Sequence, residues 1–520
     1  MPAIIEMIRR NRTQVITFAA IVVFFLLAAN GMETQDWVIT VLRGLAVAAV
    51  TFLVASGFSL IFGLMDVLNL AHGTLFMIGA YIAWSVYLRP DAMVDLATPL
   101  ALLAAGILLA PFAESALARW QPSSGILRFF PWLALGVGLI ILFWAFPRFP
   151  IAMWDTQKYD ASPVIYSAQL DTGKLILPAN AQAETSVVIT SGVSVLVAGA
   201  LIALALAAFA QRHRASAPAR WSAKALTIPL GLIVLGLIVF AMNEALTQTL
   251  LNIGTTARFF IAVIVATLAG AGLGALMESS LIRQLYARPI YQLMLTLGLG
   301  VIGREIVIAI WGRTQITMAK PDLFANVGKG CPAQNIGDWL ANGCSTINFM
   351  GSRIRTYNEI FVILVGVIVL IIVWIILQKS RIGMVIRAGV QDREMVEALG
   401  TNVRRVFTLV FALGVGLAAL GGALAGPFMG VSDSMGESLL LSALIALAIG
   451  GLTSFPGAAA GSLLVGLMQQ FIVKYGQIGI TLPFLAQPFK PTPPLVPAST
   501  VLLMVIILLV MPQGLFGRKE

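Results

Sequence analysis

Long, uninterrupted stretches of apolar residues dominate this chain. Each stretch runs for roughly 15–25 residues, which is the length that a helix needs to cross the hydrocarbon core of a bilayer. The strands of an outer-membrane barrel would instead give alternating segments of about 10 residues. The pattern therefore predicts an all-α polytopic membrane protein with about 14 hydrophobic spans. The predicted spans are 14–30, 37–62, 73–88, 98–113, 131–147, 188–210, 225–242, 259–277, 291–311, 358–378, 406–428, 438–452, 456–475 and 498–512.

Two of these spans leave alternatives open. The span 14–30 follows Arg9, Arg10 and Arg12, as the apolar part of a signal peptide would. No A-x-A-like cleavage site follows it, so we interpret it as a retained first helix. The span 438–452 is short, which leaves a re-entrant loop as an alternative to a complete crossing.

The composition agrees with a membrane protein and argues against the soluble classes. Hydrophobic residues make up 59% of the 520 residues and charged residues only 11%, whereas a soluble domain has about 25% charged residues. A chain with so few polar groups cannot cover the surface of a soluble enzyme, and it is too apolar to be disordered. The net charge of +10 therefore does not indicate nucleic-acid binding.

The positive charges indicate how the chain is oriented. With the N-terminus in the cytoplasm and every span crossing once, the inside loops hold 19 Lys and Arg in 105 residues, and the outside loops hold 10 in 147. Cytoplasmic loops of membrane proteins are enriched in Lys and Arg. We therefore predict cytoplasmic N- and C-termini and a multi-pass protein of the bacterial inner membrane.

The two cysteines lie in one predicted outside loop. Cys331 and Cys344 are thirteen positions apart, with Pro332, Gly337 and Gly343 near them. In an oxidising periplasm they are expected to form a disulfide bond, which for a loop of this size adds about 3 kcal/mol of stability. The alternative is a pair of free thiols.

Signals of catalysis are sparse. The chain has no G-x-x-x-x-G-K-[ST] motif, and Gly328-Lys329-Gly330 has no Ser or Thr after the lysine. No His, Cys and carboxylate cluster has the spacing of metal ligands. We therefore predict no catalytic residue, no metal site and no cofactor in this chain, and a protein that is not an enzyme.

The segment 63–73 is polar between two strongly apolar spans. Asp66, Asn69 and His72 recur every three residues, so on a helix they would form one polar stripe. Polar groups in a membrane are costly unless they face protein or water. Gly63 and Gly73 flank the stripe where a helix could break, and a broken helix often lines a substrate path. The alternative is a short cytoplasmic loop with its helix caps.

Two further features suggest function. Arg304 and Glu305 lie inside the span 291–311 and point about 100° apart on a helix, so they cannot simply pair with each other. They either line the translocation route or join helices in a structural salt-bridge network. The inside loop 379–405 alternates apolar and charged residues as an amphipathic helix does. It suggests a docking element for a partner, or a helix lying on lipid headgroups.

Four motifs closely resemble the permease subunits of branched-chain amino acid ABC importers, a family that also includes urea and short-amide permeases. They are G-L-M-D-V-L-N-L-A-H-G from Gly63, Y-A-R-P-I-Y with L-T-L-G-L-G from Tyr286, S-R-I-G-M-V-I-R-A with Q-D-R-E-M-V-E-A-L-G from Ser380, and G-G-L-T-S-F-P-G-A-A-A-G-S from Gly450.

The resemblance implies two cytoplasmic ATPase subunits that bind the ATP, a second homologous permease subunit and a periplasmic substrate-binding protein. It also implies that the stretch with Arg393, Glu397, Ala398 and Gly400 seats an ATPase. Family members have about 300 residues, so an insertion with extra spans is expected here. The expected domains are 1–97 with the broken-helix motif, an insertion at 98–257, and 258–520 with the coupling loop 379–405.

The sequence thus suggests a permease that moves branched-chain amino acids from the periplasm to the cytoplasm by alternating access. Asp66, Asn69, His72, Arg304 and Glu305 are the predicted substrate-pathway residues. The alternatives are a permease for urea or short-chain amides, and an ion-coupled secondary transporter in which Asp66, Arg304 and Glu305 carry the coupling ion.

Overall fold

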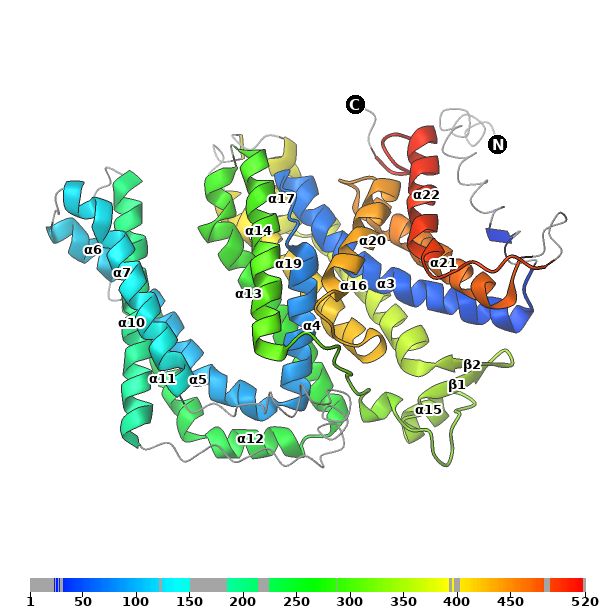
Figure 1. Cartoon of the computed structure of the whole chain (residues 1–520), viewed down its shortest axis with the longest axis horizontal. Helices are drawn as coiled ribbons and strands as arrows, with labels where there is room; N and C mark the ends of the chain where they lie inside the picture. The colour runs from blue at the N-terminus through cyan, green and yellow to red at the C-terminus, as the bar shows by residue number, and fades with distance from the viewer. Residues whose placement is uncertain are drawn as a thin grey trace. The chain divides into compact units, whose positions relative to one another are not determined.

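The described part of the chain forms two compact units. The computed structural model describes residues 31–120, 124–149, 185–213, 224–286, 288–391, 403–480 and 487–517, with residues 23, 25, 26, 28, 395 and 396. Within these residues, unit 1 comprises the chain up to Trp84 and from Thr255 onward, and unit 2 comprises the chain from Ser85 to Gly254 (Figure 1).

Unit 1 is a bundle of apolar helices with a small lobe, residues 322–355, at one end. Its long helices are α3 (Thr34–Met65), α4 (His72–Leu88, in this unit up to Trp84), α13 (Thr255–Ser280), α14 (Pro289–Trp311), α16 (Val362–Lys379), α19 (Val403–Met429), α20 (Met435–Gly450), α21 (Phe455–Ile478) and α22 (Leu495–Val510). Its short elements are η2 (Ile282–Leu285), η3 (Asp322–Phe324), α15 (Ile336–Asn342), β1 (Thr346–Phe349), β2 (Ser352–Arg355), η4 (Thr356–Phe361) and α17 (Arg381–Gln391).

Glycines let the central helices of unit 1 approach closely. A Cβ at Gly57 of α3 would lie 2.2 Å from the carbonyl oxygen of Gly414 of α19. A Cβ at Gly422 of α19 would lie 1.9 Å from the carbonyl oxygen of Phe76 of α4. Small residues at such crossings are typical of membrane bundles, where close packing rather than water exclusion joins the helices.

The predicted inside and outside loops gather at opposite ends of unit 1. Met65, Tyr286 and Phe407 pack together at the end that carries α17. At the other end, the backbones of Ile316 and Val431 pair, and the hydroxyl of Ser352 donates to the carbonyl of Gln35. Figure 1 shows α17 far from the lobe with α15, β1 and β2. The helices that connect these residues therefore run between the two ends of unit 1.

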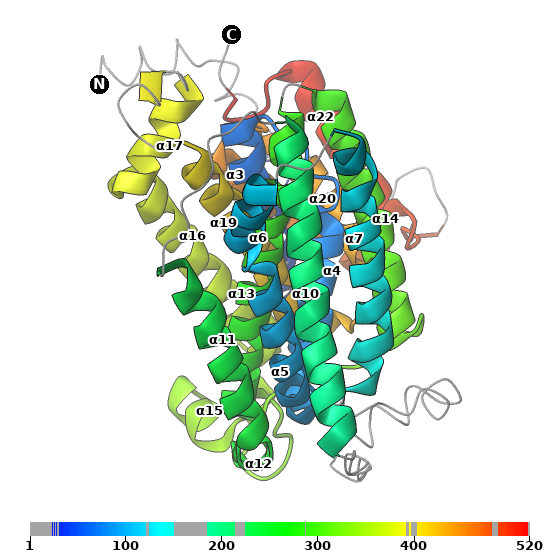
Figure 2. The same cartoon turned by 90° about the vertical axis from the view of Figure 1, so that its left-hand side faces the viewer.

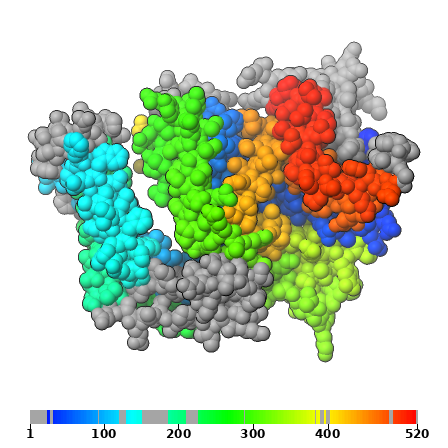
Figure 3. Space-filling view, in the orientation of Figure 1, coloured from blue at the N-terminus to red at the C-terminus, as the bar shows by residue number. Residues whose placement is uncertain are grey.

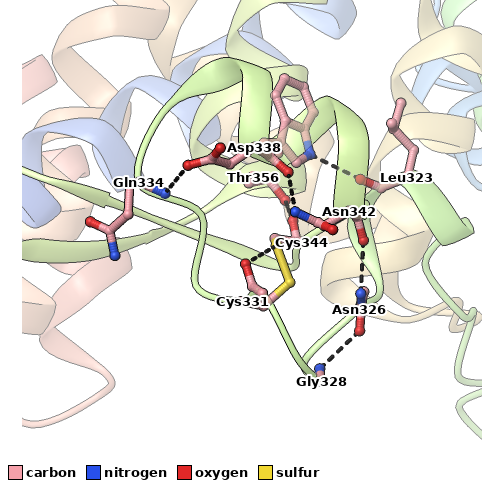
Figure 4. The surroundings of a disulfide bond; sticks show 11 residues. Leu323, Asn326, Gly328, Cys331, Gln334, Asp338, Asn342, Cys344 and Thr356 are labelled. Carbon is pink, nitrogen blue, oxygen red and sulfur yellow. Dashed lines mark hydrogen bonds between the residues drawn. A yellow bond between two sulfur atoms is a disulfide. The ribbon is translucent and has the colours of Figure 1, made fainter.

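The lobe projects beyond the helices of unit 1 (Figure 3). Its strands β1 and β2 are antiparallel, with Ile347 opposite Ile354. Met350 and Gly351 join them with φ angles of 49° and 80°, the signs that a two-residue hairpin turn requires. Cys331 and Cys344 form a disulfide bond with a Cα–Cα distance of 5.5 Å, and Figure 4 shows the polar residues around it.

Unit 2 is a separate bundle of apolar helices. Its described residues include α5 (Pro90–Ile107), α6 (Ala110–Trp120), α7 (Ser124–Ala145), η1 (Phe146–Arg148), α10 (Thr185–His213), α11 (Lys224–Ala241) and α12 (Asn243–Asn252). Figure 2 shows α5, α7, α10 and α11 alongside one another.

Two kinds of contact hold unit 2 together. Helices α5 and α10 cross at glycines, because a Cβ at Gly106 would lie 2.4 Å from the carbonyl oxygen of Leu196. The buried hydroxyl of Thr98 donates to the carbonyl of Gly236 at 3.0 Å, and the side-chain amide of Asn243 donates to Asp95 at 2.6 Å. The expected insertion at 98–257 falls almost wholly in this unit.

The described residues contain nine helices long and apolar enough to cross a membrane, or ten if the bent pair α11 and α12 is one span. Thirteen of the fourteen predicted spans coincide with helices, and 14–30 lies mostly outside the described residues. The count is lower because three of these helices are short, α4 with 17 residues and α20 and α22 with 16 each, and because α11 counts only together with α12. The protein is thus an all-α polytopic membrane protein, with fewer full-length spans in the described part than the sequence suggested.

Candidate functional site

The backbone leaves the helical path between α3 and α4. Helix α3 ends at Met65, and Asp66 adopts the left-handed conformation with φ 54° and ψ 34°. Helix α4 begins at His72. The break falls within 63–73, but Asp66 and Asn69 lie in non-helical backbone. The single helical stripe considered from the sequence is therefore wrong, since only His72 of the three residues is on a helix.

A threonine of α14 satisfies the backbone of the break. The hydroxyl oxygen of Thr296, which is fully buried, accepts a hydrogen bond from the backbone nitrogen of Leu70 at 3.2 Å. It also lies 3.2 Å from the carbonyl oxygen of Leu68 and 3.1 Å from that of Leu293 in its own helix, and it can donate its hydrogen to either of them. The hydroxyl of Thr74 donates to the carbonyl of Gly300 at 3.2 Å. Non-helical backbone at membrane depth needs such partners, so α14 supports the break.

The polar side chains of the break differ in their surroundings. Asp66 is exposed, whereas Asn69 and His72 are fully buried. The Nε2 of His72 lies 3.1 Å from the carbonyl oxygen of Val54, and its Nδ1 has no hydrogen-bond partner. Neither the amide nitrogen nor the amide oxygen of Asn69 has a partner. Buried polar atoms without partners are costly, so Asn69 is a candidate for contact with water or substrate.

The two charged residues of α14, Arg304 and Glu305, do not contact the polar side chains of the break. Arg304 forms ion pairs with Asp433 at 2.9 Å and with Glu437 at 3.2 Å. These carboxylates lie just before α20 and in its first turn, so Arg304 joins α14 to α20. Glu305 is exposed. The geometry of Arg304 agrees with the salt-bridge alternative considered from the sequence.

The inside loop 379–405 contains the expected amphipathic helix, α17. The hydroxyl oxygen of Ser380 caps this helix by accepting a hydrogen bond from the nitrogen of Gly383 at 3.0 Å. Its Val385 and Ala388 belong to a hydrophobic cluster with Val396, Val403 and Phe407. Met65 and Tyr286 pack against the same cluster. The loop therefore contacts the last residue of α3 before the break.

A buried carboxylate fixes the neighbouring turn. Glu278 is fully buried and accepts hydrogen bonds from Arg283 at 2.7 Å, Thr408 at 2.6 Å and Tyr286 at 2.6 Å. These contacts tie the end of α13 to the beginning of α19 and hold Tyr286 in place. Glu278 was not among the residues predicted from the sequence. The available signal was an acidic residue at the end of an apolar span.

The predicted ATPase-coupling residues Arg393, Glu397, Ala398 and Gly400 lie outside the described residues. Within the ranges that the structure does describe, no three His, Cys, Asp or Glu side chains gather closely enough to hold a metal ion.

Two ion pairs near the lobe end of unit 1 were not anticipated. Lys474 of α21 contacts Asp36 of α3 at 2.6 Å, and Arg43 of α3 contacts Glu359 at 3.5 Å. Arg43 and Lys474 are charges in or at the edge of predicted spans. That position was the available signal, because charged groups inside spans usually face the protein interior or a water-filled cavity.

Comparison with known proteins identifies the family. A family model described as "Branched-chain amino acid transport system / permease component" matches residues 222–511, more than half of the chain. The chain belongs to this permease family. The match begins before α13, and it includes Thr296, Arg304, α17 and the lobe.

Curated relatives of this permease are about 30% identical to it over about a third of its length. They include the high-affinity branched-chain amino acid permease protein LivH of Salmonella typhimurium, 31% identical over 185 residues, which are 35% of this chain and 54% of LivH. BraD of Pseudomonas aeruginosa, also named a branched-chain amino acid permease, is 28% identical over 183 residues, or 33% of this chain and 51% of BraD.

A third relative is named for a different substrate. The fructose import permease protein FrcC of Rhizobium meliloti is 30% identical over 178 residues, 34% of this chain and 48% of FrcC. The permease therefore spans about half the length of the curated relatives it matches. No solved structure matches it.

Proposed function

We propose that this chain is the membrane-spanning permease subunit of an ABC importer that moves branched-chain amino acids from the periplasm to the cytoplasm. Separate ATPase subunits bind ATP and supply the energy, and the chain lies in the bacterial inner membrane with both termini in the cytoplasm. The observation that carries the proposal is the packing of the loop 379–405 against Met65, directly before the break.

The mechanism is alternating access. ATP binding by the ATPases moves the loop that carries α17. Because Val385 and Val396 share one hydrophobic cluster with Met65, that movement displaces the inner end of α3. The break at 66–71 lets α3 move relative to α4, since non-helical backbone absorbs changes in φ and ψ. Asn69 and His72 then come into contact with the route.

The proposed partners follow from the family. Two cytoplasmic ATPase subunits dock on the loop 379–405, where Arg393, Glu397, Ala398 and Gly400 form the contact. A second permease subunit completes the route, and a periplasmic binding protein delivers the substrate. The names LivH and BraD, printed for branched-chain amino acid permeases, support this substrate over urea.

Uptake of leucine into membrane vesicles that contain the complete complex tests the proposal. The expected result is uptake that requires ATP inside the vesicle and persists when a protonophore abolishes the proton gradient. Gly400→Trp is expected to abolish both uptake and substrate-stimulated ATPase activity while the complex still assembles. The matched control is Gly272→Trp, because a Cβ at Gly272 would meet no other atom within 4 Å.

Two results would contradict the proposal. Leucine uptake that depends on the proton gradient and not on ATP would indicate a secondary transporter. Normal coupling in the Gly400→Trp complex would show that the ATPase docks elsewhere.

A further inference from the structure

Two adjoining hollows lie between α3, α21 and η4 in unit 1. One has a volume of about 220 Å³ and the other about 190 Å³, and Arg43 and Gln470 belong to the walls of both. Both hollows are near the lobe end of the unit, away from α17. Neither contains any of the pathway residues predicted from the sequence.

Both hollows lie beside a close crossing of α3 and α21. A Cβ at Gly466 of α21 would lie 2.4 Å from the carbonyl oxygen of Gly44 of α3, so the two backbones nearly touch. Arg43 precedes Gly44, and Gln470 follows Gly466 by about one helical turn. The long side chains of Arg43 and Gln470, next to this crossing, line both hollows.

A π-helical turn, η4 (Thr356–Phe361), forms another wall of the larger hollow. The element η4 has two anchors: the hydroxyl of Thr356 donates to the carbonyl of Cys344 at 2.8 Å, and the hydroxyl of Tyr357 donates to the carbonyl of Leu424 at 2.9 Å. The next two residues, Asn358 and Glu359, line the larger hollow. Short π-helical turns frequently mark functional sites.

The polar groups of this wall are buried and incompletely paired. Asn358 is 8% exposed and Glu359 3% exposed. Glu359 accepts a hydrogen bond from the backbone nitrogen of Arg355 and pairs with Arg43 at 3.5 Å. The side-chain oxygen of Asn358 has no hydrogen-bond partner. A buried acceptor without a partner, in the wall of a hollow, is suited to a donor on a ligand.

The lining combines both signs of charge with an apolar surface. Arg43 and Arg355 supply positive charge, Glu359 supplies negative charge, and Ala46, Val47 and Phe428 complete the wall. Arginine binds carboxylates well, whereas a carboxylate and an amide oxygen accept hydrogen bonds from an ammonium group.

We propose that the larger hollow binds a zwitterionic α-amino acid with an aliphatic side chain. The carboxylate of the ligand lies against Arg43 and Arg355, its ammonium group against Glu359 and the oxygen of Asn358, and its side chain against Ala46, Val47 and Phe428. The inference rests on the proposed function, because it assigns a binding site to the proposed substrate. It places that site near the lobe end of unit 1, apart from the break.

Saturation-transfer difference NMR on the full-length protein in nanodiscs tests the proposal, because this method detects weak binding. The probes are leucine, 3-methylbutylamine, which lacks the carboxylate, 4-methylpentanoate, which lacks the ammonium group, and urea. For the wild-type protein we expect leucine to bind at least about tenfold more tightly than 3-methylbutylamine or 4-methylpentanoate. Urea is expected to give no competition.

Two variants test which residue contacts the carboxylate of the ligand and which contacts its ammonium group. Arg43→Gln is expected to weaken leucine about tenfold and to leave 3-methylbutylamine unchanged. Asn358→Ala is expected to weaken leucine and 3-methylbutylamine together and to leave 4-methylpentanoate unchanged. The side chain of Arg43 is 42% exposed, but it pairs with the buried Glu359. The thermal midpoint of each variant is therefore measured to show that the protein is folded. The controls are Glu33→Gln and Gln334→Ala, exposed residues toward the same end of unit 1.

The outcomes separate this site from the proposed function. No leucine signal with the wild-type protein, or leucine binding that neither variant changes, overturns the site even if the complex imports leucine. Charge-dependent binding of leucine at the hollow, combined with a complex that imports no leucine, supports the site and overturns the proposed function.

Discussion

The hydroxyl oxygen of Thr296 lies 3.2 Å from the backbone nitrogen of Leu70. The two residues belong to sequence motifs 226 positions apart, and they meet where the chain leaves α3 and has not yet begun α4. One side chain thus replaces a helical hydrogen bond that the break removes. The break depends on α14 as much as on its own sequence.

Thr296→Val should therefore destabilise the protein. The substitution keeps the shape of the side chain but leaves the nitrogen of Leu70 without its partner, which costs about 1–3 kcal/mol for a buried group. Thermal unfolding in detergent measures the effect. Thr267→Val is the matched control, because the hydroxyl of Thr267 bonds only to the carbonyl of Val263 in its own helix. An equal loss in both variants would contradict this role of Thr296.

Asn69→Leu separates a pathway role from a structural role. Because both amide atoms of Asn69 are buried without partners, an apolar side chain of similar size should leave stability unchanged or raise it. If Asn69 faces the route, leucine uptake per assembled complex should fall strongly while basal ATPase activity stays intact. Unchanged uptake in a stable complex would remove Asn69 from the pathway.

A charge reversal tests the connection between α14 and α20. Arg304→Asp should lower the thermal midpoint, because it places a third carboxylate beside Asp433 and Glu437. Asp433→Arg alone should also lower it, by placing two guanidinium groups together. The double variant restores an opposite pair and should recover most of the loss. No recovery would indicate that the ion pair contributes little, as many exposed pairs do.

The disulfide bond should be present in the mature protein and should stabilise the lobe. Mass mapping of peptides under non-reducing conditions should show Cys331 linked to Cys344. The double substitution of both cysteines by serine should cost about 3 kcal/mol, the entropy estimate for a loop of this size. Two alkylatable thiols in an oxidised membrane preparation would contradict the prediction and weaken the proposed orientation.

The helices could be predicted from the sequence because their cause is local. A run such as Val362–Lys379 is apolar on every side, so only a membrane or a large core can accept it. The division into two units depends instead on which helices pack together, for example α5 on α10 through Gly106 and Gly199. No pattern within one helix shows which helix will lie beside it.

The candidate site was only partly predictable for the same reason. Asp66, Asn69 and His72 stand out because they are polar between apolar spans. The role of Thr296 could not be anticipated, because a threonine in a helix usually bonds to its own backbone. Asn358 and Glu359 acquire their meaning from Arg43 and Gln470, which come from distant parts of the chain.

Helix α3 has no proline between Thr34 and Met65 and runs unbroken for 32 residues. It can therefore act as a stiff lever with its pivot at the tight crossing of Gly57 and Gly414. Met65 lies about 12 Å from this pivot along the helix axis, and Arg43 about 21 Å on the other side, at 1.5 Å per residue. A small displacement at the coupling loop would thus move Arg43 in the opposite direction by nearly twice the distance, together with α21, because Gly44 packs tightly against Gly466.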